Sequence, residues 1–77
     1  MITDKRLSQL NCIDYTDLNL FIIGKYAMED YVTASDLFNE ASPRQQNNLL
    51  LFVKHNEDYQ PSVQRALFNF FNDLITE

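Results

Sequence analysis

The residues that could carry out acid–base chemistry lie in one short stretch of the chain. His55 is the only histidine, and Glu57 and Asp58 follow it within three residues. A histidine that activates a nucleophile needs that nucleophile within hydrogen-bond reach and a third group to orient it. Cys12, the only cysteine, has no histidine near it in the sequence, so we interpret it as a small buried hydrophobe. We therefore expect His55 to lie at a helix end and do not expect an enzyme.

Ligands for cofactors and metals are equally scarce. The chain has one glycine, which excludes a glycine-rich phosphate loop. One histidine and one cysteine do not suffice for a structural zinc site, and the carboxylates lack the spacing of a calcium-binding EF-hand. We expect no cofactor and no metal ion.

Side chains that can read DNA bases occur in one segment. Residues 33–54 have the outline of a helix-turn-helix, with Arg44, Gln45 and Asn48 in the first turns of its second helix. Such side chains make paired hydrogen bonds to guanine and adenine, and a recognition helix presents them near its N-terminus. However, the turn lacks glycine, and the net charge of −5 removes the attraction to phosphate that supplies most of the affinity. A DNA-binding regulator is therefore an alternative, and a solvated polar helix start is the simpler interpretation.

Helix-start signals define the elements that must position these residues. The chain has one glycine and two prolines, too few for the many tight turns of a sheet protein. The clearest start is Ser42-Pro43-Arg44-Gln45, where serine caps, proline takes the first helical position and glutamine closes a capping box. The sequence predicts an all-α fold, a small single-domain bundle of four to five short helices over residues 1–77. They are expected to begin after Thr3, Thr16, Thr33 and Ser42 and at Pro61, and the second is expected to run to about Asp30.

Two of these helices carry more apolar residues than one core-facing side needs. At ~100° per residue, the last helix has a core stripe and a second row beside it. The stripe consists of Val63, Ala66, Leu67, Phe70 and Leu74, and the second row of Phe68, Phe71 and Ile75. The helix after Thr16 has a second row of Leu18, Ile22 and Tyr26, opposite a core side that includes Leu20, Ile23 and Met28. Its Gly24 is expected to permit close packing of another helix.

The two extra rows predict a binding surface. A chain of this length buries only about 60–65% of its unfolded surface, and one cysteine allows no internal disulfide. Association is the remaining source of stability, so we expect a homodimer. Since aromatic anchors dominate interface energetics, the predicted partner-binding residues are Phe68, Phe71 and Ile75, followed by Leu18, Ile22 and Tyr26.

The remaining expectations concern location and mode of action. The apolar runs are too short to span a bilayer, the N-terminus lacks the apolar stretch of a signal peptide, and a lone thiol suits a reducing compartment. We expect a cytoplasmic protein without a membrane partner, of the small acidic kind typical of phage- and plasmid-encoded inhibitors. The leading hypothesis is a non-enzymatic protein-binding module that acts as an inhibitor or adaptor by occluding a partner with a basic surface. An acidic mimic of nucleic acid is a further alternative, although the acids occur as dispersed pairs.

Overall fold

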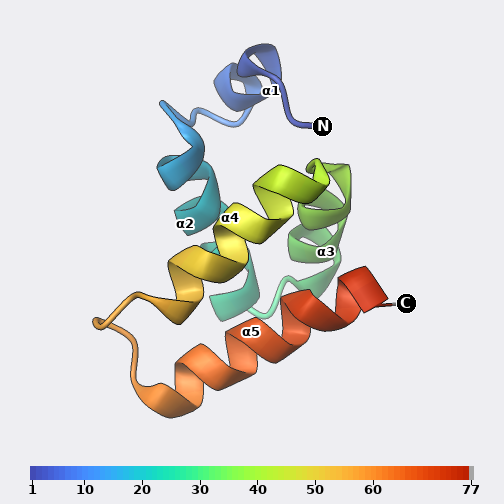
Figure 1. Ribbon diagram of the computed structural model, residues 1–77. Coiled ribbons are helices and arrows are strands. Elements are labelled where there is room, and N and C mark those ends of the chain that lie inside the picture. The colour runs from blue at the N-terminus through green and yellow to red at the C-terminus, as the bar shows by residue number, and fades with distance from the viewer. Residues whose placement is uncertain (77) are drawn as a thin grey trace.

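The computed structural model describes residues 1–76, and within them the chain forms five helices and no strand (Figure 1). The prediction of an all-α bundle of four to five short helices is confirmed. The helices are α1 (Asp4–Gln9), α2 (Tyr15–Ala27), α3 (Tyr31–Glu40), α4 (Pro43–Lys54) and α5 (Pro61–Thr76). α2 packs against α3 and α4, and α5 packs against α3 and α4. The short α1 lies at the end of the bundle opposite α5 (Figure 1).

Two predicted helix caps are confirmed in atomic detail. The Thr3 hydroxyl accepts a hydrogen bond from the Arg6 N–H and so caps α1. At α4, the Ser42 hydroxyl accepts from the Gln45 N–H, and Gln45 Oε1 accepts from the Ser42 N–H at 2.9 Å. This pair is the predicted capping box, with Pro43 in the first turn. Such patterns predict helix starts well because they satisfy backbone N–H groups that the helix itself leaves unpaired.

The other two predicted caps, Thr16 and Thr33, are wrong. α2 begins after Asp14 and α3 begins after Asp30. Their carboxylates accept hydrogen bonds from the backbone N–H groups of Asp17, at 2.9 Å, and of Thr33, at 3.2 Å. An aspartate caps as well as a threonine or better, and its negative charge also complements the positive end of the helix dipole. Both threonines therefore lie inside the first turn of their helices.

Two short connections turn through residues with left-handed backbone. Asn11 follows α1 with a φ of 59°, and Glu29 follows α2 with a φ of 63°. Asparagine tolerates this conformation, whereas for glutamate it carries a steric cost. The turn at Glu29 ends α2 at Ala27, before the end near Asp30 that the sequence predicted.

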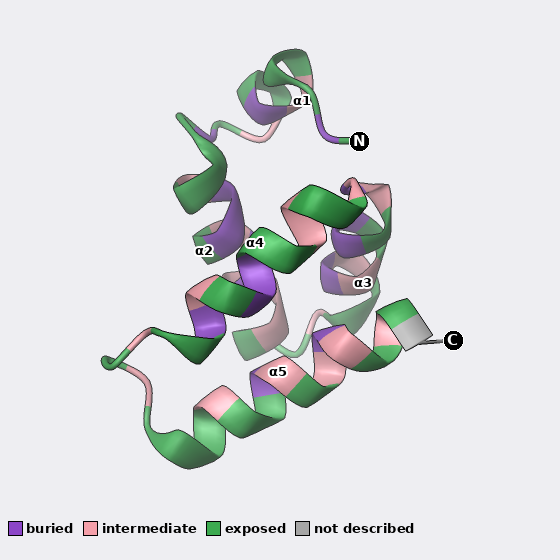
Figure 2. Ribbon diagram, viewed as in Figure 1, coloured by how far each residue is buried: buried purple, intermediate pink, exposed green. Residues whose placement is uncertain are grey.

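The core receives side chains from every helix and from residues outside the helices, namely Ile2, Cys12 and Ala41 (Figure 2). Leu49, Leu50 and Val53 of α4 are buried, and Leu51 points away from the core. The largest fully buried side chains are Ile2, Ile22, Phe38, Leu49, Val53 and Phe71. The burial of Ile2 means that the N-terminal segment is docked against the bundle.

The rotation of α5 differs from the prediction. Its buried residues are Leu67, from the predicted core stripe, and Phe71, from the predicted partner-binding row. The side of α5 that faces the core therefore lies between the two predicted rows. Val63, which was expected in the core, is 42% exposed. The reason is the contact across the bundle, because the Phe71 ring lies 5.1 Å from the Phe38 ring, centroid to centroid. Phe71 is thus a core residue and not a partner-binding one.

The predicted sides of α2 are largely reversed. Leu18 and Ile22, expected to bind a partner, are each only 2% exposed and belong to the core. Leu20 and Met28, expected to face the core, are exposed, whereas Ile23 is buried as predicted. The apolar residues of α2 extend around most of the helix, so the side that is buried depends on where α3 and α4 pack.

Gly24, in the middle of α2, does not mark a close helix contact. A Cβ placed there would meet no atom within 4 Å outside its own stretch of helix, and its φ is not positive. The predicted close packing is therefore wrong, and this glycine weakens the helix without a gain in packing.

Candidate functional site

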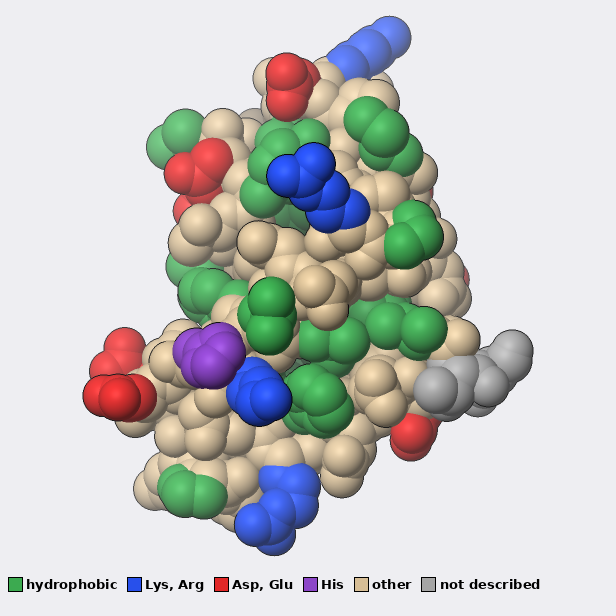
Figure 3. Space-filling model, in the orientation of Figure 1, with side chains coloured by type: hydrophobic (Ala, Val, Ile, Leu, Met, Phe, Trp, Pro, Cys, Tyr) green, Lys and Arg blue, Asp and Glu red, His purple; other side chains and the backbone are tan. Residues whose placement is uncertain are grey.

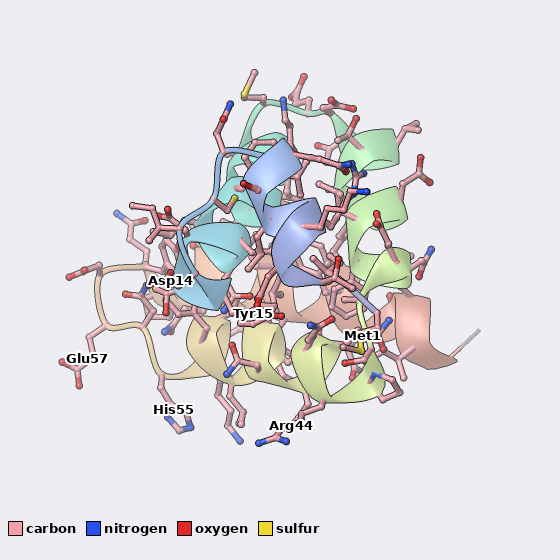
Figure 4. All side chains as sticks on the ribbon, turned by 90° about the horizontal axis from the view of Figure 1, so that it is seen from above. Met1, Asp14, Tyr15, Arg44, His55 and Glu57 are labelled. Carbon is pink, nitrogen blue, oxygen red and sulfur yellow. The ribbon has the colours of Figure 1, made fainter. Side chains whose placement is uncertain are left out.

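A groove lies beside the first turns of α4, bordered by α2 and by the first residue of the chain. Its volume is about 620 Å³. Figure 4 shows the side chains of Met1, Tyr15 and Arg44 around this end of α4, and all three line the groove. These residues are far apart in the sequence, so the groove exists only in the folded chain.

The floor of the groove is apolar. Leu18 and Ile22 come from α2, Phe38 from α3 and Leu49 from α4, and all four belong to the core. The groove therefore reaches down to the hydrophobic core. Leu18 and Ile22 lie buried at the bottom of the groove. They do not form the exposed row that the sequence predicted.

Two apolar side chains also stand at the edge of the groove. Met1 is 78% exposed and Leu51 is 45% exposed. Sequence reasoning did not assign either residue to a site. The one available signal was that Leu51 falls off the core face of an otherwise regular amphipathic helix.

Gln45, predicted as a possible DNA-reading residue, is used for structure instead. Its Oε1 accepts hydrogen bonds from the backbone N–H groups of Ile2 and Ser42, both at 2.9 Å. Its Nε2 donates to the Ile2 carbonyl oxygen at 2.8 Å, which also accepts from the Tyr15 hydroxyl at 3.1 Å. One amide therefore holds the N-terminal segment on α4 and forms one edge of the groove. A side chain with these partners cannot also read a base.

A second amide pair connects α2 to α4 at the groove. Asn19 is buried and donates from Nδ2 to Oδ1 of Asn48 at 2.9 Å. A buried side-chain amide needs such a partner, because an unsatisfied one costs about 1–3 kcal/mol. Because Asn48 uses its amide oxygen in this pair, its amide N–H groups stay available as donors to a ligand.

Charge is distributed unevenly around the groove. Arg44 is the one charged side chain among its described lining residues. The chain has eleven Asp and Glu residues, yet residues 41–56, which include all of α4, contain none. In Figure 3, two basic side chains lie nearer the middle of this face and others lie at its top and bottom edges, whereas the acidic ones lie toward its edges. Arg6 of α1 and Glu40 of α3 form an ion pair, with 2.8 Å between Arg6 Nε and Glu40 Oε1. Arg44 takes no part in this ion pair.

The remaining predicted partner-binding residues lie elsewhere. Tyr26 packs against Phe70 at 4.9 Å and Tyr31 at 5.3 Å between ring centroids, in a partly exposed aromatic cluster between α2, α3 and α5. Phe68 is half-buried against the core, and Ile75 is 48% exposed near the end of α5. The structure therefore does not bring the six predicted residues together on one surface.

The acid–base candidates do not form a catalytic arrangement. His55 is the exposed C-cap of α4, so its expected position at a helix end is confirmed. His55, Glu57 and Asp58 line a shallow hollow of about 420 Å³, and Figure 4 shows His55 and Glu57 pointing in different directions. Among the described residues, no group of three His, Cys, Asp or Glu side chains is placed to hold a metal ion.

Cys12 is buried, as its interpretation as a small hydrophobe predicts. Its thiol donates a weak hydrogen bond to the Leu10 carbonyl oxygen at 3.7 Å. Burial raises the pKa of the Cys12 thiol, and the nearby carboxylates of Asp17 and Asp14 raise it further. The thiolate, which is the reactive form, is therefore disfavoured.

Comparisons of the chain with protein-family models, with curated proteins and with solved structures gave no match. None of the described helices is long and apolar enough to cross a membrane.

Proposed function

We propose that this protein is a non-enzymatic protein-binding module that acts as an inhibitor or adaptor by holding and occluding part of a partner protein. The observation that carries the proposal is the groove at the start of α4. It combines an apolar floor, exposed apolar side chains at its edge and hydrogen-bonding amides around it. Binding sites in proteins are concave, mostly apolar and supplied with a few polar groups that fix orientation.

Side chains at the edge of the groove favour a polypeptide partner. Leu51 is exposed on a helix side whose other exposed residues, such as Asn47 and Asn48, are polar. An anchor residue of a partner that enters the groove would contact Leu51 and Met1 and remove their apolar surface from water. Desolvation at about 25 cal/mol per Å² of apolar surface would supply the affinity, and the amides would supply specificity.

The predicted homodimer and the predicted basic surface on the partner stay predictions. The homodimer was based on a row of α5 whose central residue, Phe71, is buried. The acidic side chains that would steer a basic partner lie outside α4. Light scattering after size exclusion over a range of concentrations measures self-association directly, and the proposed groove does not require it.

Site-specific photo-crosslinking tests the proposal. A photoreactive amino acid replaces Leu51 in one variant and Val32 in the control. Val32 is an aliphatic residue of α3 outside the groove and is more exposed than Leu51, at 73% against 45%. In cells that naturally contain the protein, we expect one discrete protein adduct from position 51 and none from position 32. The purified partner should then bind the Leu51→Lys variant at least tenfold more weakly, about 1.4 kcal/mol, with unchanged circular dichroism. Equal adducts at both positions, or none at position 51, would refute the proposal.

A DNA-binding regulator is the second candidate. The observation that favours it is the exposed side of α4, where Arg44, Asn48 and Lys54 project from a helix without any acidic residue. A fluorescence anisotropy titration with a labelled duplex at low salt tests it. Binding that weakens with salt and is lost in Arg44→Ala would support this candidate, and absence of binding at low salt would remove it.

A further inference from the structure

The groove differs in charge from the rest of the molecule. The net charge of the chain is −5, but no Asp or Glu is found among the described groove residues. Arg44 supplies a single positive charge, and its side chain is exposed. Three acidic residues, Asp14, Asp17 and Glu40, directly precede lining residues, but their carboxylates already accept hydrogen bonds from the Asp17 and Ile13 N–H groups and from Arg6. Arg44 is therefore the charged side chain that the groove itself offers to a ligand.

The hydrogen-bonding groups that remain for a ligand are mostly donors. Gln45 and the Tyr15 hydroxyl are bonded to the N-terminal segment, and the Asn48 carbonyl oxygen is bonded to Asn19. Arg44 has five N–H donors and no acceptor, and the Asn48 amide nitrogen donates as well. The exposed Asn47 adds two donors and one acceptor. The groove is thus suited to acceptor groups, above all to a carboxylate, which an arginine can bind through two parallel hydrogen bonds.

We propose that the occupant of the groove is a segment of a partner protein that places an apolar side chain against Met1 and Leu51 and an Asp or Glu carboxylate at Arg44. This inference rests on the proposed function and specifies the chemistry of the partner. Apolar contact is made with the exposed side chains of Met1 and Leu51, and the carboxylate is placed at the exposed Arg44. The partner segment is therefore both acidic and hydrophobic.

Nucleic acid fits this site less well. Binding of a duplex depends on several phosphate contacts from Lys and Arg, and the groove has one arginine. A phosphate backbone would also leave the exposed apolar side chains of Met1 and Leu51 without a matching group. A segment with one carboxylate beside one apolar side chain matches both features at once.

Selection from a random peptide display library against the full chain tests this inference. The selected peptide is then synthesised with a fluorescent label, and its affinity is measured by anisotropy. We expect a recurring apolar residue next to an Asp or Glu in the selected peptides. Affinity should fall about tenfold in Arg44→Gln, whereas the control Arg65→Gln, an exposed arginine on α5 outside the groove, should bind like the original protein. Added salt should weaken binding to the original protein but have little effect on Arg44→Gln.

The outcomes separate this inference from the proposed function. If the selected peptides lack acidic residues and bind Arg44→Gln normally but fail to bind Leu51→Lys, the acidic-partner inference is wrong and the groove remains a protein-binding site. If no peptide is enriched, or if Leu51→Lys binds normally, both are wrong. If a labelled DNA duplex binds at low salt and Arg44→Gln abolishes that binding, the occupant is nucleic acid and the inference is overturned.

Discussion

Gln45 offers the sharpest test of how the structure is held together. The variant Gln45→Ala removes three hydrogen bonds, two from backbone N–H groups to Oε1 and one from Nε2 to the Ile2 carbonyl oxygen. It opens the capping box of α4 and releases the N-terminal segment at the same time. Few single side chains in the molecule connect residues so distant, since Ile2 and Gln45 are 43 positions apart.

The expected loss of stability follows from these contacts. Each hydrogen bond contributes a net ~0.5–1.5 kcal/mol, which gives about 1.5–4.5 kcal/mol for three. Ile2 is fully buried, and its release from the core would cost about 1.5–3 kcal/mol, part of which overlaps with the lost hydrogen bonds. We expect Gln45→Ala to lower the free energy of unfolding by about 2–4 kcal/mol. For a chain of this size, each kcal/mol corresponds to ~4–8 °C in Tm.

Urea denaturation followed by circular dichroism measures this loss. The matched control is Gln46→Ala, because Gln46 is the next residue on α4 and makes one hydrogen bond, from Nε2 to the Phe38 carbonyl oxygen at 2.9 Å. It should cost about 1 kcal/mol. A double-mutant cycle of Gln45→Ala with Ile2→Ala should show coupling, since either change releases the same segment. Equal costs for the two glutamine variants, together with additive effects in the cycle, would show that Gln45 does not hold the N-terminal segment.

Further predictions follow from individual residues. Phe71→Ala should cost about 3–5 kcal/mol in urea denaturation and unfold much of the protein at room temperature, because Phe71 is fully buried; a folded variant with stability near the original would contradict its place in the core. Gly24→Ala should stabilise the protein by about 1 kcal/mol in the same assay, since a Cβ meets no neighbour there, and any destabilisation would reveal a close contact. Hydrogen bonds from the side chain and backbone of Thr33 lower the pKa of Asp30, so its capping stabilises the fold above the pKa of an unfolded aspartate and is lost as the pH falls through the lower folded value. Asp30→Asn should therefore show a shallower loss of stability in acid than the original protein, and identical acid titrations would exclude this contribution. Because burial raises its pKa, the Cys12 thiol should react with iodoacetamide more slowly in the folded protein than in urea, and equal rates would show that the thiol is accessible.

The sequence was sufficient where the signal is local. The Ser42-Pro43-Arg44-Gln45 start and the cap at Thr3 were predicted correctly, because a cap involves only residues three positions apart. Even local patterns can compete, as at α2, where Asp14 and Thr16 are both good caps and the aspartate is used.

Tertiary structure decided which side of α2 and of α5 is buried. In α5 the apolar arc is wide enough for several rotations, and the contact of Phe71 with Phe38 selects the one observed. A periodic pattern gives the existence of a helix but not its rotation when most of its circumference is apolar. The predicted interface on Phe68, Phe71 and Ile75 was wrong at Phe71 for this reason.

The groove could not be predicted from the sequence, since Met1, Tyr15, Arg44 and Leu51 meet only after the helices pack. Gln45 illustrates both levels. Its hydrogen bonding with Ser42 could be predicted because the two residues are close in the sequence. Its hydrogen bond with Ile2 could not be predicted, because these residues are 43 positions apart. The sequence by itself determined an acidic chain of capped helices with an acid-free α4 whose first turns are polar. Only the folded structure decided that the start of α4 borders an apolar groove, because that depends on which distant side chains the packing brings beside it.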